Sequence, residues 1–232
     1  MTAIRSAISV FLAAMVGCAG ASAADLVLRE SFSPSPPPSQ ERFKNWYLHV
    51  GPAGLIYSES VKLKAGGGRV PGADVRIPAS LTFAAEIGYF LNPNFAIGAA
   101  FGFPPLTKFE ARGVLTGLGT LGKASGGPAA LMAQYHFTGF GRFQPYVGVG
   151  PAILYIFNEN DGTVNNLKVE HAVGVSLQAG FNYMIDESWG VFVDAKKVIL
   201  RTRGSGSLGG VPIKAEVTLD PLVLQAGVGY RF

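Results

Sequence analysis

The chain has 232 residues, of which 48% are hydrophobic and only 15% are charged, below the roughly 25% charged residues usual in soluble proteins. This composition is too apolar for a disordered chain. The formal net charge of +4, with no basic cluster along the sequence, argues against nucleic acid as a partner. No apolar run of about 18 residues follows the first two dozen positions, which disfavours a helical membrane protein.

Residues 1–23 have the features of a cleaved export signal. Arg5 supplies a positive region, an apolar stretch follows, and the small residues 21–23 provide a cleavage site after Ala23. Cys18 permits a rival interpretation as a lipid-attachment site, although Met15 stands where such sites prefer Leu. Residues 24–44, which include a Pro-rich run, are expected to form a periplasmic lead-in, because proline cannot enter a sheet ladder.

From Asn45 onward the sequence alternates at period 2, which predicts β-strands. Between residues 170 and 185, one face carries Val, Leu, Phe, Tyr and Ile, and the other carries small or polar residues. Near the end, Leu224 and Val228 share a face, whereas Arg231 lies on the opposite one. Because an arginine against lipid is costly, the polar face should point inward. Eight strands are predicted, at 45–57, 79–91, 94–103, 128–137, 143–157, 170–185, 188–202 and 222–232.

The links between these strands alternate in length. Short turns fall at 92–94, 138–142 and 186–187, whereas the links near 58–78, 104–127, 158–169 and 203–215 are long and rich in glycine. Aromatic residues gather near the short turns. This arrangement is typical of a bacterial outer-membrane barrel with short periplasmic turns and long extracellular loops. A soluble barrel or sandwich with an aromatic core is the alternative.

Residues 117–124 nearly match a phosphate-binding loop, but Ala124 stands where Ser or Thr would hold the metal ion. This segment is therefore interpreted as a flexible outer loop. The histidines lie on separate predicted strands without metal-binding spacing. No metal and no cofactor are expected.

Three stretches resemble the OmpW family of eight-stranded outer-membrane proteins. They are Pro128–Phe137 followed by Phe143–Gly150, Gly180–Asp186 followed by Trp189, and Leu219–Pro221 leading into Gly229–Phe232. The resemblance covers roughly residues 45–232 and implies an all-β, eight-stranded antiparallel transmembrane barrel in the outer membrane of a Gram-negative cell. It also implies passive passage of small hydrophobic molecules, which leave the barrel sideways into the bilayer.

The inward parity suggests two groups of functional residues. Glu86, Asp194, Lys196 and Arg231 would form a polar plug, because charges inside a barrel must pair or be hydrated. Apolar inward positions toward the extracellular end would line a hydrophobic channel, and ordinary packing beneath the loops is the alternative. The candidate lining residues are Leu154, Ile156, Val198, Leu200, Phe103 and Leu106.

Two other functions stay open at the level of sequence. The loops could bind a host surface, a phage or a bacteriocin. A lipid-modifying enzyme is less favoured, because His171 has lipid-facing parity but no serine shares that face nearby. The expected partners are outer-membrane lipid, hydrophobic solutes and the barrel-assembly machinery, which would engage the final strand ending in Phe232. A monomer or weak oligomer is expected.

Overall fold

A computed structural model describes residues 44–232. The predicted signal peptide, and all of the Pro-rich lead-in except Lys44, lie outside the described residues. Within 44–232, no helix is both long enough and apolar enough to cross a membrane.

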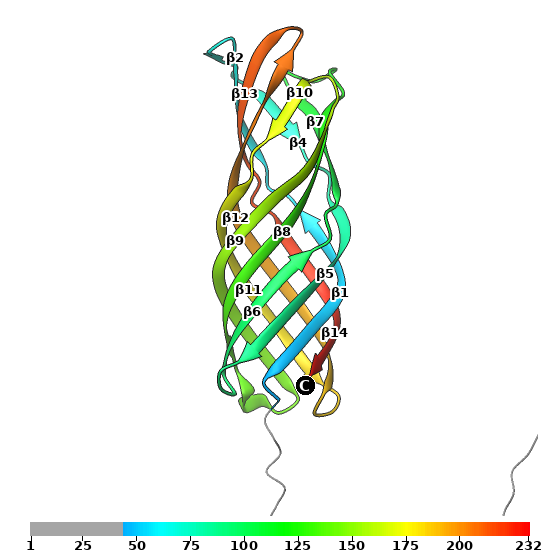
Figure 1. The fold of residues 1–232 in the computed structure, drawn as a ribbon, viewed down its shortest axis with the longest axis vertical. Helices are drawn as coiled ribbons and strands as arrows, with labels where there is room; N and C mark the ends of the chain where they lie inside the picture. Colours follow the sequence, from blue (N-terminus) through cyan, green and yellow to red (C-terminus); the bar gives the residue numbers. More distant parts are fainter. Residues whose placement is uncertain (1–43) are drawn as a thin grey trace, which may run out of the picture. The chain divides into compact units, whose positions relative to one another are not determined.

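Eight antiparallel strands form a closed barrel, as predicted (Figure 1). Each strand pairs with the next around the wall, and the last pairs with the first, so that the sheet closes on itself. In order around the wall the strands are β1 (Trp46–Ile56), β5 (Ser80–Phe90), β6 (Phe95–Gly102), β8 (Thr120–His136), β9 (Phe143–Asp161), β11 (Ala172–Met184), β12 (Trp189–Leu208) and β14 (Leu222–Arg231).

The connections at one end of the barrel are short and are held by side-chain oxygens. Asn92 Oδ1 accepts hydrogen bonds from the backbone N–H groups of Asn94 and Phe95, each at 2.9 Å. Asp186 Oδ1 likewise accepts from Ser188 and Trp189, each at 2.7 Å. These bonds, that from Trp189 first, hold the pKa of the Asp186 carboxyl below its ordinary value. The third connection contains the 3₁₀ helix η1 (Thr138–Phe140).

The long links at the other end are mostly strands, which the sequence analysis did not predict. They contain β2 (Ser60–Ala65), β3 (Gly68–Arg69), β4 (Ala73–Arg76), β7 (Leu106–Gly113), β10 (Asn165–Val169) and β13 (Val211–Thr218). Strands β9 and β12 also continue well beyond their predicted ends, to Asp161 and Leu208. The barrel wall therefore extends past the membrane-spanning part (Figure 1).

The interpretation of 117–124 as a flexible loop is wrong from Thr120 onward, because β8 begins there. Its backbone pairs with β7 on one side and β9 on the other. The alternation of polar and apolar residues that predicts a strand is not visible here, because the stretch contains several glycines. At Gly122 a methyl group would lie 2.4 Å from Leu167 Cδ2 and 3.2 Å from the backbone oxygen of Asn160, so Leu167 would have to move to admit a side chain.

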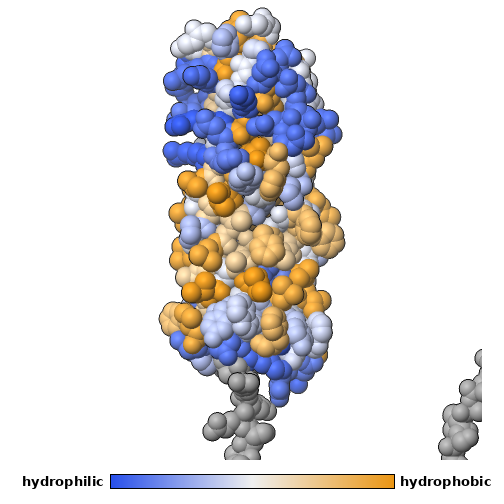
Figure 2. All heavy atoms as spheres, in the orientation of Figure 1, coloured by the Kyte–Doolittle hydropathy of each residue, from blue (hydrophilic) through white to orange (hydrophobic). Residues whose placement is uncertain are grey.

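The outer wall of the barrel carries an apolar belt with polar residues beyond it (Figure 2). Exposed aliphatic residues such as Val149, Val193 and Ile199 lie on outward positions. Aromatic rings of the predicted girdle pair near the short turns, with ring centroids 5.0 Å apart for Trp46 and Tyr89. Such a belt with aromatic residues at its edge is what a lipid-facing barrel presents.

Candidate functional site

A buried ion-pair cluster lies inside the barrel. Lys196 Nζ lies 2.7 Å from Asp194 Oδ1 and 3.2 Å from Glu86 Oε2, and all three residues are buried. Asp194 and Lys196 both come from β12, where inward positions alternate, whereas Glu86 comes from β5. The two strands are not neighbours in the wall, so the ion pair spans the interior.

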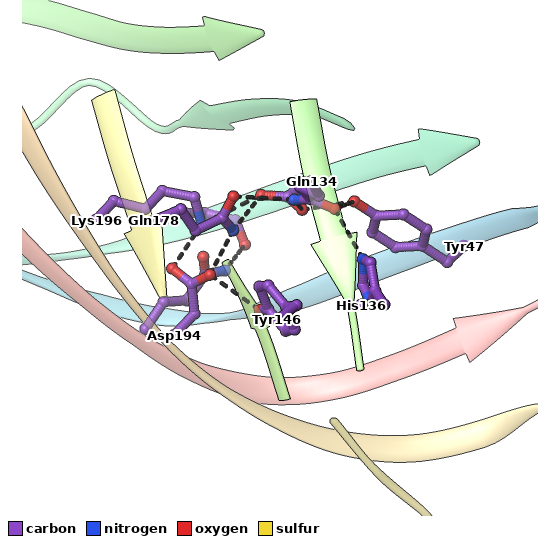
Figure 3. Close-up of polar contacts among 10 residues, drawn as sticks. Tyr47, Gln134, His136, Tyr146, Gln178, Asp194 and Lys196 are labelled. Atoms are coloured by element: carbon purple, nitrogen blue, oxygen red, sulfur yellow. Dashed lines mark hydrogen bonds and ion pairs between the residues drawn. The ribbon is translucent and has the colours of Figure 1, made fainter. Parts of the chain in front are cut away.

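Amide and phenol groups complete the cluster (Figure 3). Gln134 donates to Glu86 Oε1 at 2.7 Å, and Gln178 donates to Glu86 Oε2 at 3.0 Å and to Asp194 Oδ2. The Tyr146 hydroxyl donates to Asp194 Oδ2 at 2.9 Å. We call these six residues, together with Tyr47, the polar floor. The Tyr47 hydroxyl lies 2.7 Å from Glu86 Oε1.

Glycines on neighbouring strands make room for the two phenol rings of the polar floor. At Gly88 a methyl group would lie 2.1 Å from Tyr47 Cε1. At Gly180 it would lie 2.8 Å from the Tyr146 hydroxyl oxygen. The sequence shows that both glycines face inward, whereas the ring that each one accommodates is seen only in the structure.

Rings pack on the short-turn side of the polar floor. His49 stacks on Phe192, with ring centroids 4.3 Å apart, and His136 stacks on Tyr146 at 4.9 Å. An eight-stranded barrel is only wide enough for its side chains to fill. These buried rings therefore fill the interior between the polar floor and the short turns.

Three of the four predicted plug residues come together, and the fourth lies apart. Arg231 is at the end of β14, where its Nη2 donates to Gln144 Oε1 and its guanidinium lies 5.0 Å from the Phe90 ring centroid. It makes no ion pair with Glu86 or Asp194. Among residues 44–232 there is no group of three His, Cys, Asp or Glu side chains that could hold a metal ion.

An apolar cavity, here the lower cavity, lies on the other side of the polar floor, toward the long-link end. It encloses about 1110 Å³, including space open to solvent, and Lys196 lies at its boundary. Four predicted residues line it, namely Leu154, Ile156, Val198 and Leu200. Phe103 and Leu106 do not line it, and their side chains are 70% and 54% exposed. The structure therefore does not place these two residues in the lining, although Pro105, which lies between them in the sequence, does line the lower cavity.

A second apolar cavity, the upper cavity, continues into the extension of the barrel. It encloses about 750 Å³ and is bordered by aliphatic residues of β2, β4, β10 and β13. Phe109, Val169 and Thr202 line both cavities. The two cavities therefore adjoin at Phe109.

The lower cavity reaches the outside of the barrel at one place in the wall. Phe101 and Ile153 have outward parity and are half exposed, yet both line this cavity. Ala129 of β8 pairs with both of them. The preceding residues 126–128 have no partner on the β6–β7 side, since β6 pairs with 129–135 and β7 with 120–125. Pro128 cannot donate a ladder hydrogen bond, which weakens the sheet here.

The model of the OmpW family matches residues 46–232. The chain belongs to the OmpW family. It is 34% identical over 170 residues to the outer membrane protein AlkL of Ectopseudomonas oleovorans, covering 73% of this chain and 74% of AlkL. It is 33% identical to the dibenzothiophene metabolism operon protein PahQ of Pseudomonas aeruginosa, covering 81% and 88% of the two chains. This OmpW-family protein is therefore a barrel of the outer membrane.

The fold also matches a solved structure. The crystal structure of OprG from Pseudomonas aeruginosa superimposes with a TM-score of 0.75, covering 82% of this chain and 96% of OprG at 22% identity. At that identity the likeness concerns the fold, which is the closed eight-stranded barrel.

Several residues of the site were not predicted from the sequence. Gln134, Gln178 and Tyr47 were not assigned to the plug, although Gln134 and Gln178 are among the buried polar residues of their strands. A search for amides on the inward parity would have found them. Phe109 could not be recognised from the sequence as a residue that lines both cavities, because its strand was expected to be a loop.

Proposed function

We propose that this OmpW-family barrel lets small hydrophobic molecules pass passively across the outer membrane, by way of the two apolar cavities and sideways into the bilayer. The main observation behind this proposal is the lower cavity. It is apolar, ends at the polar floor, and reaches the outer wall at Phe101 and Ile153. Straight passage to the periplasm would take an apolar solute through buried charges and packed rings. Exit through the wall leads instead into hydrocarbon.

Entrance would occur at the upper cavity, in the part of the barrel beyond the apolar belt. Leu115, Leu121 and Ile213 offer an apolar surface there. A solute that buries about 200 Å² of apolar area gains roughly 5 kcal/mol on leaving water. The bilayer offers a comparable gain, so transfer from water through the cavities to lipid runs downhill. No coupled energy source is required.

In this proposal, the four lining residues predicted from the sequence form part of the wall of the lower cavity. Leu154 and Ile156 come from β9, whereas Val198 and Leu200 come from β12. The relative PahQ is named for a dibenzothiophene metabolism operon, and dibenzothiophene is an apolar aromatic compound. This name supports a solute of that chemical class.

The test uses Leu154→Asp with Val198→Asp, expressed in a Gram-negative strain that lacks its own barrels of this family. Initial uptake of radiolabelled dibenzothiophene should fall to the level of cells without the protein, because carboxylates in the lower cavity remove its affinity for apolar solutes. The matched control is Leu154→Ala with Val198→Ala, which keeps the surface apolar and should retain most uptake. Folding is checked by heat-modifiable gel migration. Unchanged uptake in a folded Asp variant would refute the proposed route.

A further inference from the structure

A dense group of cations lies on the outer wall of the extended barrel, outside both cavities. We define the basic wall as Lys62, Lys64, Arg69, Lys168, Arg203 and Lys214. These residues come from five strands, β2, β3, β10, β12 and β13, and all six are exposed. They are scattered along the sequence, which is why no basic cluster is visible there. Strand pairing alone brings them together.

The register of the strands places like charges directly opposite one another. Lys214 pairs with Lys64, and Lys64 pairs with Arg69. On the other side of β12, Lys168 pairs with Ser205, which itself pairs with Lys214. The residues in register across these five strands are Lys168, Ser205, Lys214, Lys64 and Arg69. This row therefore contains four cations and no acid. Like charges at opposite positions destabilise a sheet, so this row is costly unless an anionic partner binds it.

The next row, nearer the apolar belt, contains Arg203, Glu216 and Lys62 in register. Glu170 lies beside Arg203 through a backbone hydrogen bond. Within residues 44–232, none of the six basic-wall side chains makes an ion pair or a hydrogen bond. Two further acids, Glu159 and Asp161, accept hydrogen bonds from backbone N–H groups of β10 on either side of Lys168, at Val169 and Leu167. These four acids are outnumbered by the six cations of the basic wall.

Charges on β4 and β7 are better balanced than those of the basic wall. Asp74 pairs with Arg112, and Arg76 pairs with Glu110, so charges of opposite sign stand in register there. Lys108 of β7 does pair with Lys123 of β8, but this is a single pair of like charges. The basic wall is therefore the larger group of cations without acids in register.

The height of the basic wall identifies the source of the anion. A strand tilted by about 40° rises about 2.5 Å along the barrel axis per residue. The ten residues from Trp189 in the aromatic girdle to Ile199, the last outward apolar residue of β12, then span about 25 Å, the height of an outer-membrane apolar band. Arg203 lies about 10 Å beyond Ile199, and the row of Ser205 and Lys214 about 15 Å beyond it. The headgroup region of a bilayer adds about 5–8 Å on each side of the hydrocarbon core. The basic wall therefore begins just beyond that region, at a level that a large glycolipid headgroup projecting outward from the leaflet would reach.

We propose that the basic wall binds the phosphate groups of a phosphorylated glycolipid of the outer leaflet. Lysine and arginine both recognise phosphate, and arginine can do so with two parallel hydrogen bonds. The basic wall faces sideways, toward neighbouring lipids, rather than upward at the tip of the barrel. A lipid headgroup fits this placement better than a soluble anion, which would have no reason to meet the side of the wall.

The test titrates the purified full barrel, in neutral detergent micelles, with diphosphoryl lipid A and counts retained lipids by native mass spectrometry. The variant is Lys64→Gln with Arg69→Gln and Lys214→Gln. Each cation near an anionic lipid contributes about fivefold in affinity, so binding should weaken by at least about tenfold. The control, Arg76→Gln with Lys108→Gln and Arg112→Gln, removes the same charge from β4 and β7 and should change binding by less than about threefold.

Several results would overturn the proposal. Equal weakening in both variants would show general attraction to a positive protein, and unchanged binding in the first variant would show that the basic wall is not the site. If lipid A stripped of its phosphates binds as tightly as diphosphoryl lipid A, phosphate is not what is recognised. If inorganic phosphate or a sulfated polysaccharide occupies the basic wall and diphosphoryl lipid A does not, the partner is a soluble anion. Both variants should keep heat-modifiable migration, since all substituted residues are exposed.

Discussion

The ammonium group of Lys196 lies between two carboxylates, 2.7 Å from Asp194 Oδ1 and 3.2 Å from Glu86 Oε2, at the boundary between the lower cavity and the packed rings (Figure 3). One cation thus compensates two anions in the interior of the barrel. The remaining carboxylate oxygens accept hydrogen bonds from Gln134, Gln178 and Tyr146. Each buried carboxylate therefore depends on this shared cation and on its hydrogen-bond donors.

Removing the cation should destabilise the barrel strongly. In Lys196→Met the carboxylates of Glu86 and Asp194 lose their only cationic partner within the described interior cluster, and breaking a buried pair in this way costs about 3–5 kcal/mol. Reversible urea unfolding in lipid vesicles measures this loss. The triple variant Lys196→Met with Glu86→Gln and Asp194→Asn should recover much of it, because no charge is left unpaired. A triple variant as unstable as the single one would contradict this account.

The contact of Tyr47 with Gly88 predicts a second loss of stability. In Gly88→Ala the new methyl group would meet the Tyr47 ring at 2.1 Å, so the ring must leave its place beside Glu86. Overpacking of this kind costs about 1–3 kcal/mol. Gly54→Ala is the matched control on the same wall, because its nearest neighbour would be a backbone oxygen 4.0 Å away. Urea unfolding should separate the two variants, and equal stability would contradict the packing argument.

The barrel strands and the inward charges could be predicted from sequence because alternation directly reports which side of a strand meets lipid. Glu86 and Lys196 lie inside for that reason. The sequence could not predict that they would meet, since this depends on how β5 and β12 face each other across the closed wall. Arg231 shares the same parity but lies at a different height, and parity carries no information about height.

The extension of the barrel could not be predicted, because its strands have a different residue pattern from the membrane-spanning strands. Beyond the bilayer the outward residues are polar and many inward ones are small or glycine, so β7 and the start of β8 resemble loops in the sequence. Phe109 and Leu121 point into the upper cavity, but a short amphipathic strand rich in glycine gives too little contrast to be recognised. The basic wall could not be predicted either, because most of the strands that bring its residues together were expected to be loops.

The turn between β11 and β12 should respond to pH through Asp186. The folded structure lowers the pKa of this carboxyl, so its contribution is present above the ordinary value of 3.8 and is lost as the pH falls through the lowered pKa. Compared with Asp186→Asn, the wild-type amides of Ser188 and Trp189 should exchange more slowly at neutral pH. The difference should disappear at low pH, where the carboxyl is neutral. Hydrogen exchange measured at each pH on both proteins checks this, and a difference that stays constant would contradict it.

The opening in the wall beside β8 predicts where a bulky residue should block passage. Ala129 has outward parity and pairs with Phe101 on one side and Ile153 on the other, the two residues at which the lower cavity reaches lipid. Ala129→Trp should fill this opening and lower the initial uptake of dibenzothiophene severalfold. Ala133→Trp is the matched control, because Ala133 pairs with Ile97 and Val149 on the same outer face, and none of these three residues lines the lower or the upper cavity. Both tryptophans would contact lipid, so neither should unfold the barrel. Equal uptake by the two variants would show that solutes do not leave between Phe101 and Ile153, and would remove the sideways exit from the proposed route.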